Sequence, residues 1–284
     1  MQLDQRAALT AVFEDTKQMI QDSVKLTQAV TVSRQRTRIW QEGDSPSLPR
    51  NFGFRTEITV TRSRSFEAAV RLRGQFPDER IAVHNFASAT NPGGGVEHGS
   101  SAQEESLCRC STLFPVLKSN RLFGEYYAFH KARHDAHYTD ACVWSPDIYI
   151  IKTDTAEPKR LPESEWCKVD VLTCAAPNLR TRPNNKMNPG NDITVHMTND
   201  ELLELHKHRA RQLLSAAAAQ GDTVLVLGAF GCGAFRNPPA VVAQAYKEIL
   251  PEFEGYFKLV EFAVYCPPEH PENYNTFMKT LGKK

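Results

Sequence analysis

The sequence lacks several features that would assign it to a class at once. No apolar run approaches the roughly 20 residues of a membrane helix, and the first residues show neither the basic nor the apolar region of a secretion signal. Lys and Arg number 34 against 33 Asp and Glu, so no overall positive field predicts a nucleic-acid partner. The seven cysteines are odd in number and scattered, which excludes a disulfide framework. We therefore expect a cytoplasmic protein without membrane contact.

Several chemical motifs are missing as well. No Gly-Lys-Ser/Thr follows a glycine loop, which excludes a Walker A site, and no G-x-S-x-G elbow supports a serine hydrolase. His130, His134 and His137 have a spacing that could present imidazoles to zinc, but no acidic partner is fixed by spacing, and Cys108 and Cys110 lack a second pair. We predict no metal and no cofactor. Without heptads or a long exposed apolar stripe, we also expect a monomer.

Hydrophobic periodicity predicts an α/β protein. Alternating or continuous apolar runs predict strands, and 3.6-residue periodicity predicts helices, in a strand–helix–strand order that favours a largely parallel sheet. The strands are expected over 56–61, 81–87, 148–151, 168–175, 223–227 and 258–265. The helices are expected over 6–28, 66–76, 101–115, 199–219, 239–250 and 273–281. The expected N-caps are Ser65, Asn199 or Asp200, and Asn237. Residues 34–54 are expected to cross the surface without regular structure.

The stretch from Asn91 to Glu105 carries the strongest chemical signal. Three consecutive glycines follow a buried-looking strand, and Gln103-Glu104-Glu105 opens the next helix. A glycine run alone is often a flexible loop, and such an acidic run is usually a solvated helix start. Together, at the carboxyl end of a strand, they favour a site that holds a nucleotide-like diphosphate beside carboxylates suited to acid–base chemistry.

A second glycine loop, Gly228 to Phe235, lies between an apolar strand and a helix that begins near Pro239. The free N–H groups of a helix start favour an anion. A tight strand–helix turn is the simpler alternative, but two such loops at one sheet edge could clamp a diphosphate from both sides. Cys232 in this loop could be an activated nucleophile, although a small residue that lets the loop close is the favoured interpretation.

These residues resemble a known family. Asn-Pro-Gly-Gly-Gly at 91–95, followed by Gln-Glu-Glu at 103–105, resembles the signature of the bacterial-type poly(ADP-ribose) glycohydrolases, which have a macrodomain fold. The spacer 96–102 lies within the family's range. Further blocks that resemble the family are found at 103–109, 111–113, 138–140, 145–147, 175–178 and 228–237.

The resemblance implies a three-layer α/β/α macrodomain with a mixed, mostly parallel central sheet. Residues 1–55 would form an N-terminal helical extension packed on the core, and residues 56–284 the catalytic core, within a single domain. The substrate would be poly(ADP-ribose) or another ADP-ribosylated macromolecule, and the product ADP-ribose.

The resemblance also implies a role for each site residue. Glu105 would be the catalytic acid, with Glu104 and Gln103 orienting the ribose and supporting it. Asn91 would contact the distal ribose, and Phe235 would pack near it. The backbone of two loops would hold the diphosphate, the first made of Gly93, Gly94, Gly95 and Val96 and the second of Gly231, Cys232, Gly233 and Ala234.

The chemistry fits these residues. Cleavage of a ribose–ribose O-glycosidic bond passes through an oxocarbenium-like state, and the leaving oxygen needs a proton. Glu105 can supply it if burial or the neighbouring Glu104 raises its pKa. Two alternatives stay open, a mono-ADP-ribosyl hydrolase acting on modified protein or nucleic acid, and a non-catalytic ADP-ribose reader. Arg180, Arg182 and Lys186 could add a local basic contact, although a solvated loop is the simpler interpretation.

Overall fold

The computed structural model describes residues 3–185 and 193–282, and its centre is a seven-stranded sheet. The strand order is β1-β4-β5-β3-β6-β7-β2, with β1, β4 and β5 antiparallel and the five strands from β5 to β2 parallel. The strands are β1 Arg38–Trp40, β2 Glu57–Thr61, β3 Ile81–Phe86, β4 Cys142–Ile150, β5 Cys167–Cys174, β6 Val224–Leu227 and β7 Leu259–Ala263. The predicted mixed, mostly parallel sheet is confirmed.

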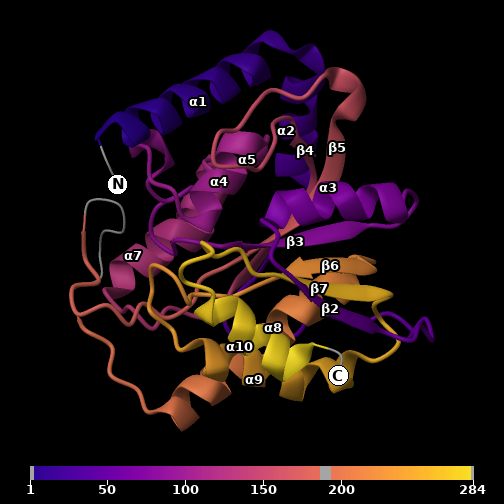
Figure 1. Ribbon diagram of the computed structural model, residues 1–284, viewed down its shortest axis with the longest axis vertical. Coiled ribbons are helices and arrows are strands. Elements are labelled where there is room, and N and C mark those ends of the chain that lie inside the picture. The colour runs from indigo at the N-terminus through magenta and orange to yellow at the C-terminus, as the bar shows by residue number, and fades with distance from the viewer. Residues whose placement is uncertain (1–2, 186–192, 283–284) are drawn as a thin grey trace.

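Helices cover both faces of this sheet, which gives the predicted three layers. In Figure 1, α1 to α5 lie on one side of the strands and α8 to α10 on the other. The helices are α1 Leu3–Asp22, α2 Val24–Arg36, α3 Ser65–Gln75, α4 Gln103–Cys110, α5 Leu113–Leu117, α6 Asn120–Leu122, α7 Phe129–Arg133, α8 Asn199–Ala219, α9 Pro239–Ile249 and α10 Glu272–Leu281. A π-helical turn, Phe123–Ala128, joins α6 to α7.

Alternation along the buried strands creates a hydrophobic core on each face. In β3, Ile81 and Val83 belong to the same core as Phe66 of α3, whereas Ala82 belongs to the opposite core with Phe277 of α10. Successive side chains of a strand point to opposite faces of the sheet, so a strand that is covered on both faces consists of an uninterrupted run of apolar residues. This explains why β6 is a continuous apolar segment and why β3 begins with three apolar residues before His84 and Asn85.

The N-terminal part of the chain differs from the expectation. The helix expected over 6–28 is two helices, interrupted at Ser23, whose Oγ accepts a hydrogen bond from the N–H of Leu26 at 3.3 Å. The segment 34–54 contains the end of α2 and the strand β1, which pairs with β4 at the sheet edge. Residues 41–54 contain no helix or strand, as expected, but β1 was not predicted because a three-residue edge strand is too short to show a period.

Other element boundaries also move. The helix expected over 101–115 is divided into α4 and α5 by Ser111, whose backbone is extended. The caps of α3 and α8 are Arg64 and Thr198, which precede the predicted Ser65 and Asn199 or Asp200. In both helices a glutamate three residues after the cap accepts its N–H, and in α8 the hydroxyl of Thr198 accepts the N–H of Glu201 in return at 3.3 Å.

Helix α1 is fastened to the core through buried contacts. The ring of Phe13 is fully buried and meets Phe114 of α5 edge-on at 4.9 Å. The hydroxyl of Thr16 donates to the carbonyl of Arg109 in α4, and the ammonium of Lys152 donates to the carbonyl of Val12 at 2.6 Å. These contacts tie α1 to the helix that carries the Gln-Glu-Glu run.

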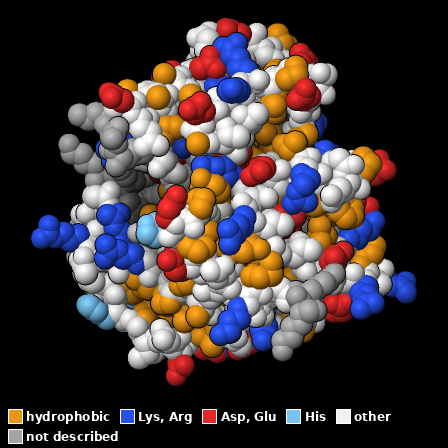
Figure 2. All heavy atoms as spheres, viewed as in Figure 1, with side chains coloured by type: hydrophobic (Ala, Val, Ile, Leu, Met, Phe, Trp, Pro, Cys, Tyr) orange, Lys and Arg blue, Asp and Glu red, His pale blue; other side chains and the backbone are white. Residues whose placement is uncertain are grey.

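The surface carries both signs of charge. On the face drawn in Figure 2, Lys and Arg side chains are interspersed with Asp and Glu, in agreement with a net charge of +1. Within residues 3–185 and 193–282, no helix combines the length and the apolar character that a membrane span requires.

At the edge of the sheet where β5 and β6 begin, two carboxyl groups are buried together. Asp222 is fully buried beside Asp170, and it accepts a hydrogen bond from the indole N–H of Trp144 at 3.0 Å. Arg80 donates to Asp170, and its Nε lies 3.5 Å from Asp222. Burial, and then the charge of Asp170, hold the pKa of Asp222 well above its ordinary value.

Replacing Asp222 by asparagine is therefore expected to stabilise the protein at pH 8. A carboxyl with a raised folded-state pKa contributes stability that is complete below its unfolded pKa, about 4, and is lost as the pH rises toward the folded pKa. An amide avoids this loss, so the melting temperature should rise by about 2–4 °C at pH 8 and the difference should vanish near pH 4. Thermal unfolding at both pH values tests this, with exposed Asp78→Asn as the control. An unchanged or lower melting temperature at pH 8 would contradict it.

Candidate active site

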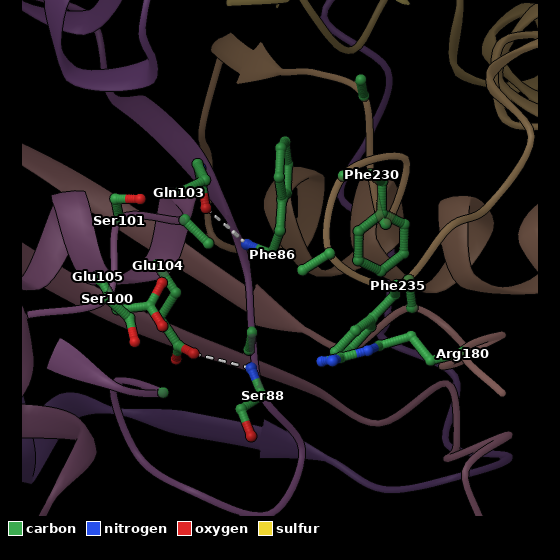
Figure 3. Close-up of a pocket in the computed structure, with 18 of the residues that line it drawn as sticks. Phe86, Ser88, Ser100, Ser101, Gln103, Glu104, Glu105, Arg180, Phe230 and Phe235 are labelled. Carbon is green, nitrogen blue, oxygen red and sulfur yellow. Dashed lines mark hydrogen bonds between the residues drawn. The ribbon is translucent and has the colours of Figure 1, made fainter. Parts of the chain in front are cut away.

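A cavity of about 620 Å³ opens where the carboxyl ends of β3, β5 and β6 meet. Parallel neighbours end at the same edge, so the loops that follow these strands and the start of α4 are brought together there. Figure 3 shows Glu104, Glu105 and Gln103 on one side of the cavity and Phe230 and Phe235 on the other. The two glycine loops of the sequence thus converge, as expected.

The first glycine loop forms a turn whose backbone is hydrogen-bonded to the side chain of Glu105. Gly93 and Gly94 have φ of +71° and +56°, a conformation that favours glycine. The N–H of Gly94 donates to the carbonyl of Asn91 at 2.9 Å, and that of Gly95 donates to Oε1 of Glu105 at 2.9 Å. The side chain of Asn91 donates to the carbonyl of Gly94. The loop therefore holds the carboxyl group in place through its own backbone.

Only part of this loop lines the cavity. Among the described residues, Gly94 lines the cavity, whereas Asn91, Gly93, Gly95 and Val96 do not. Val96 is fully buried and packs in the core on the α3 face. The structure thus brings the predicted loop to the site, but only one of its glycines forms the wall.

Gln103 joins α4 to the end of β3. Its Oε1 accepts the N–H of Phe86 at 2.9 Å, while its Nε2 donates to Ser65 at 3.0 Å and to the carbonyl of His84 at 2.7 Å. The residue lines the cavity, yet every donor and acceptor of its amide already has a protein partner. These bonds fix the start of α4, and with it the two glutamates.

Both glutamates are buried at the cavity wall. Glu104 is 3% exposed and accepts the N–H of Ser88 at 2.8 Å and the amide of Asn85 at 3.3 Å; Glu105 is 7% exposed. Burial, with a contribution from the charge of Glu105, raises the pKa of Glu104 to about 8. Burial also raises the pKa of Glu105, opposed by the N–H of Gly95. Both carboxyl groups thus hold their protons more tightly than usual.

Burial is the largest cause of the Glu105 shift. The two carboxyl groups also act on each other, since the charge of Glu105 adds to the raised pKa of Glu104. Both causes proposed from the sequence, burial and a neighbouring carboxyl, are therefore found in this pair, and burial is the larger.

The second glycine loop presents backbone donors to the same cavity. Within the described chain, the N–H groups of Gly231, Gly233, Ala234 and Phe235 make no hydrogen bond. All four residues line the cavity. A row of unpaired N–H groups in a concave loop is an anion-binding arrangement. Cys232 lies between them but does not line the cavity, and burial raises the pKa of its thiol, which disfavours the nucleophile alternative.

Aromatic side chains form the wall opposite the glutamates. Phe235 packs against Tyr138 with ring centroids 6.1 Å apart. Phe230 packs against Phe86 at 5.9 Å and against the buried ring of His84 at 4.5 Å. This places Phe235, predicted to pack near a ribose, across the cavity from Glu105 (Figure 3).

Several cavity residues were not identified from the sequence. Arg6 of α1, Ser88 and Asn185 line the cavity, and no local motif marks them. From the sequence, a solvated loop is the simpler interpretation for Arg180. In the structure it lines the cavity, and Figure 3 shows its guanidinium pointing inward beside Phe235. Lys186, considered with it, lies outside the described residues.

The spaced histidines have other partners. The ring of His130 is buried between the carbonyl of Tyr126 and the hydroxyl of Thr139, each at 2.8 Å, and His137 pairs with Asp135. Across residues 3–185 and 193–282, no group of three or more His, Cys, Asp or Glu side chains is arranged to hold a metal ion. In the same segment, Tyr126 and Tyr127 are buried in the core.

Comparison with known proteins gives a consistent result. Residues 9–153 match the family model of the microbial-type PARG catalytic domain, PARG being poly(ADP-ribose) glycohydrolase. Among solved structures, the Thermomonospora curvata enzyme bound to the inhibitor ADP-HPD is 31% identical with a TM-score of 0.79, over 96% of this chain and 99% of that one. The Deinococcus radiodurans enzyme in complex with ADP-ribose is 36% identical with a TM-score of 0.72, over 88% and 96%.

Among curated proteins, none matched the chain. The family model nevertheless covers just over half of the sequence, and the similarity to the solved glycohydrolases extends over nearly all of it. The fold, the two converging loops and these matches agree, and the chain belongs to the microbial-type poly(ADP-ribose) glycohydrolase family.

Proposed function

We propose that this glycosidase hydrolyses ribose–ribose O-glycosidic bonds in poly(ADP-ribose) and releases ADP-ribose, with Glu105 as general acid and then general base. One observation carries the proposal. A buried carboxyl with a raised pKa faces, across one cavity, a loop in which the N–H groups of 231 and 233–235 have no partner in the described chain. An acid beside an anion site is what cleavage next to a diphosphate requires.

The cavity supports a specific placement of the ligand. The N–H groups of Gly231, Gly233 and Ala234 would hold the diphosphate, with Gly94 of the first loop closing the other side. The distal ribose would lie between Phe235 and Glu105, which face each other across the cavity. Arg180, which lines the cavity, would add a positive charge for a phosphate. The relatives that hold ADP-ribose and ADP-HPD support a ligand of this class at the site.

The proposed reaction uses one carboxyl group twice. Glu105 gives its proton to the leaving oxygen as the bond to the anomeric carbon breaks, and the bonding electrons stay on that oxygen. The resulting carboxylate then takes a proton from a water molecule whose oxygen bonds to the cationic carbon. Glu104 would orient the ribose and Gln103 would hold the start of α4 in place, because both side chains are fixed by hydrogen bonds to β3 and the loop after it.

Two other functions make different predictions. A mono-ADP-ribosyl hydrolase would use the same cavity on a singly modified target, and a reader would bind ADP-ribose without cleaving. A reader has no need of a buried acid at the cavity wall, which favours the enzyme. The deciding experiment compares free ADP-ribose released from poly(ADP-ribosyl)ated protein and from singly modified protein, with ADP-ribose binding measured in parallel. We expect release from the polymer; binding without release from either substrate would establish a reader.

Three further properties belong to this proposal. Residues 1–55 would act as an extension of the catalytic core at 56–284, because α1 packs on α4 and contributes Arg6 to the cavity. The described chain carries seven free thiols, which supports a reducing, cytoplasmic location. The protein would work as a monomer.

A further inference from the structure

The second glycine loop is organised around one buried side chain that lines no part of the cavity. Asn237 is 1% exposed and lies between the end of this loop and the start of α9 at Pro239. Its Nδ2 lies within hydrogen-bonding distance of three carbonyl oxygens, those of Pro177 at 2.9 Å, Gly231 at 3.2 Å and Phe235 at 3.3 Å. Its backbone N–H also donates to the Gly231 carbonyl at 3.0 Å. The two ends of the donor-bearing segment are thus tied to one amide.

These three carbonyls also fix the orientation of the amide. A carbonyl oxygen can only accept, so the NH₂ group must face them and Oδ1 must point the other way. Oδ1 meets Nε2 of His206, on α8, at 2.8 Å. Since Oδ1 is an acceptor, Nε2 of His206 carries the proton. Burial lowers the pKa of His206 to about 4, so the ring is neutral and keeps this tautomer at physiological pH.

We infer that His206 is a positioning residue for the reaction, acting through Asn237 to hold the second glycine loop in its anion-binding shape. The hydrogen bond from His206 to Asn237 affects the loop because the loop backbone packs closely against the Asn237 amide. Gly231 has φ of +74°, and a Cβ on it would lie 2.6 Å from Nδ2 of Asn237. A rotation of the amide would therefore displace the loop, and the N–H groups of Gly233 and Ala234 with it.

The inference rests on the proposed function, and it predicts a particular kinetic signature. A preformed loop that binds the diphosphate does so equally in the ground state and in the transition state, so its loss raises KM and leaves kcat nearly unchanged. General damage to the fold lowers the active fraction instead, which reduces kcat at unchanged KM. The two roles can thus be separated in one data set.

The experiment compares His206→Leu, which removes the donor, with His206→Gln, whose amide can donate to Oδ1 of Asn237. Ala216→Gly, at a buried position further along α8, serves as a control for loss of helix stability. For each full-length variant, the ADP-ribose dissociation constant is measured by calorimetry, and kcat and KM are measured from ADP-ribose release. The melting temperature is recorded alongside.

We expect His206→Leu to raise both KM and the ADP-ribose dissociation constant about tenfold, the usual order for one lost buried hydrogen bond and its unpaired partner. His206→Gln should recover most of the affinity, and Ala216→Gly should bind as the wild type does. Unchanged affinity in His206→Leu, or equal defects in the leucine and glutamine variants, would overturn the inference. A wild-type protein that binds ADP-ribose but releases none would contradict the proposed function alone, since calorimetry would still test the role of His206.

Discussion

Replacing Glu105 by glutamine is expected to lower the rate of ADP-ribose release by about 10³-fold, within the range for loss of a general acid–base group. Glutamine has nearly the same shape, and its Oε1 can accept the Gly95 N–H that Glu105 accepts at 2.9 Å. It cannot give a proton to the leaving oxygen or take one from water. ADP-ribose should still bind within about threefold of the wild-type affinity, because the lost interaction acts in the transition state.

Glu97→Gln is the matched control for this variant. Glu97 lies on the same connection between β3 and α4, but its side chain is 48% exposed and paired with Lys118 at 3.1 Å. The control should release ADP-ribose at the wild-type rate. Near-wild-type turnover by Glu105→Gln, with binding intact, would show that another group supplies the proton.

The same assignment fixes the direction of the pH dependence. Glu105 acts first as an acid, so the free enzyme must hold its proton. Because burial raises the pKa of this carboxyl, the protonated form persists to a higher pH than for an exposed glutamate. We therefore expect kcat/KM to decrease as the pH rises through the raised pKa of Glu105, and not to decrease through this group as the pH is lowered.

The sequence predicts the sheet and the site well where the signal is local. Strand β6, Val224–Leu227, shows a continuous apolar run because both of its faces are covered, and a glycine loop follows at once. Strand β3 begins with an apolar run but continues through His84 and Asn85, and a short connection separates it from the loop at 91–95. Parallel strands end at the same edge of a sheet, so strand direction predicts that both loops lie at one edge, and the structure shows that β3 and β6 are neighbours.

The sequence does not reveal the role of a side chain whose partners are distant along the chain. Arg6 reaches the cavity because α1 packs on α4, about a hundred residues later. Asn237 looks like a helix cap, since asparagine before proline is typical of one, but His206 and the loop carbonyls hold its side chain. Gln103, assigned to the ribose by resemblance, forms all of its amide bonds with the protein. Pattern alone cannot distinguish such uses of a polar side chain.

Gly94→Ala is expected to lower turnover by about 10²-fold, because a misplacement of order 1 Å at a reacting group has this effect. A Cβ at this position would lie 2.6 Å from Oε1 of Glu105 and 3.3 Å from Oε2 of Glu104. Both carboxyl groups would have to move, and they are buried and held by backbone donors, so neither can turn freely toward solvent. Rates of ADP-ribose release from the polymer measure the effect.

The effect of backbone strain in Gly94→Ala can be distinguished from the effect of the contact with the carboxyl groups, because the chain has a second glycine in a similar conformation. Gly43 has φ of +80°, close to the left-handed region of Gly94 at +56°, and a Cβ on it would meet no atom of the described chain within 4 Å. Gly43→Ala thus carries the left-handed strain without any contact to a carboxyl group. If the loss in Gly94→Ala came from backbone strain, both variants would lose stability together and activity in proportion. If it comes from displacement of Glu105, only Gly94→Ala loses turnover, and it does so while still folded at the assay temperature.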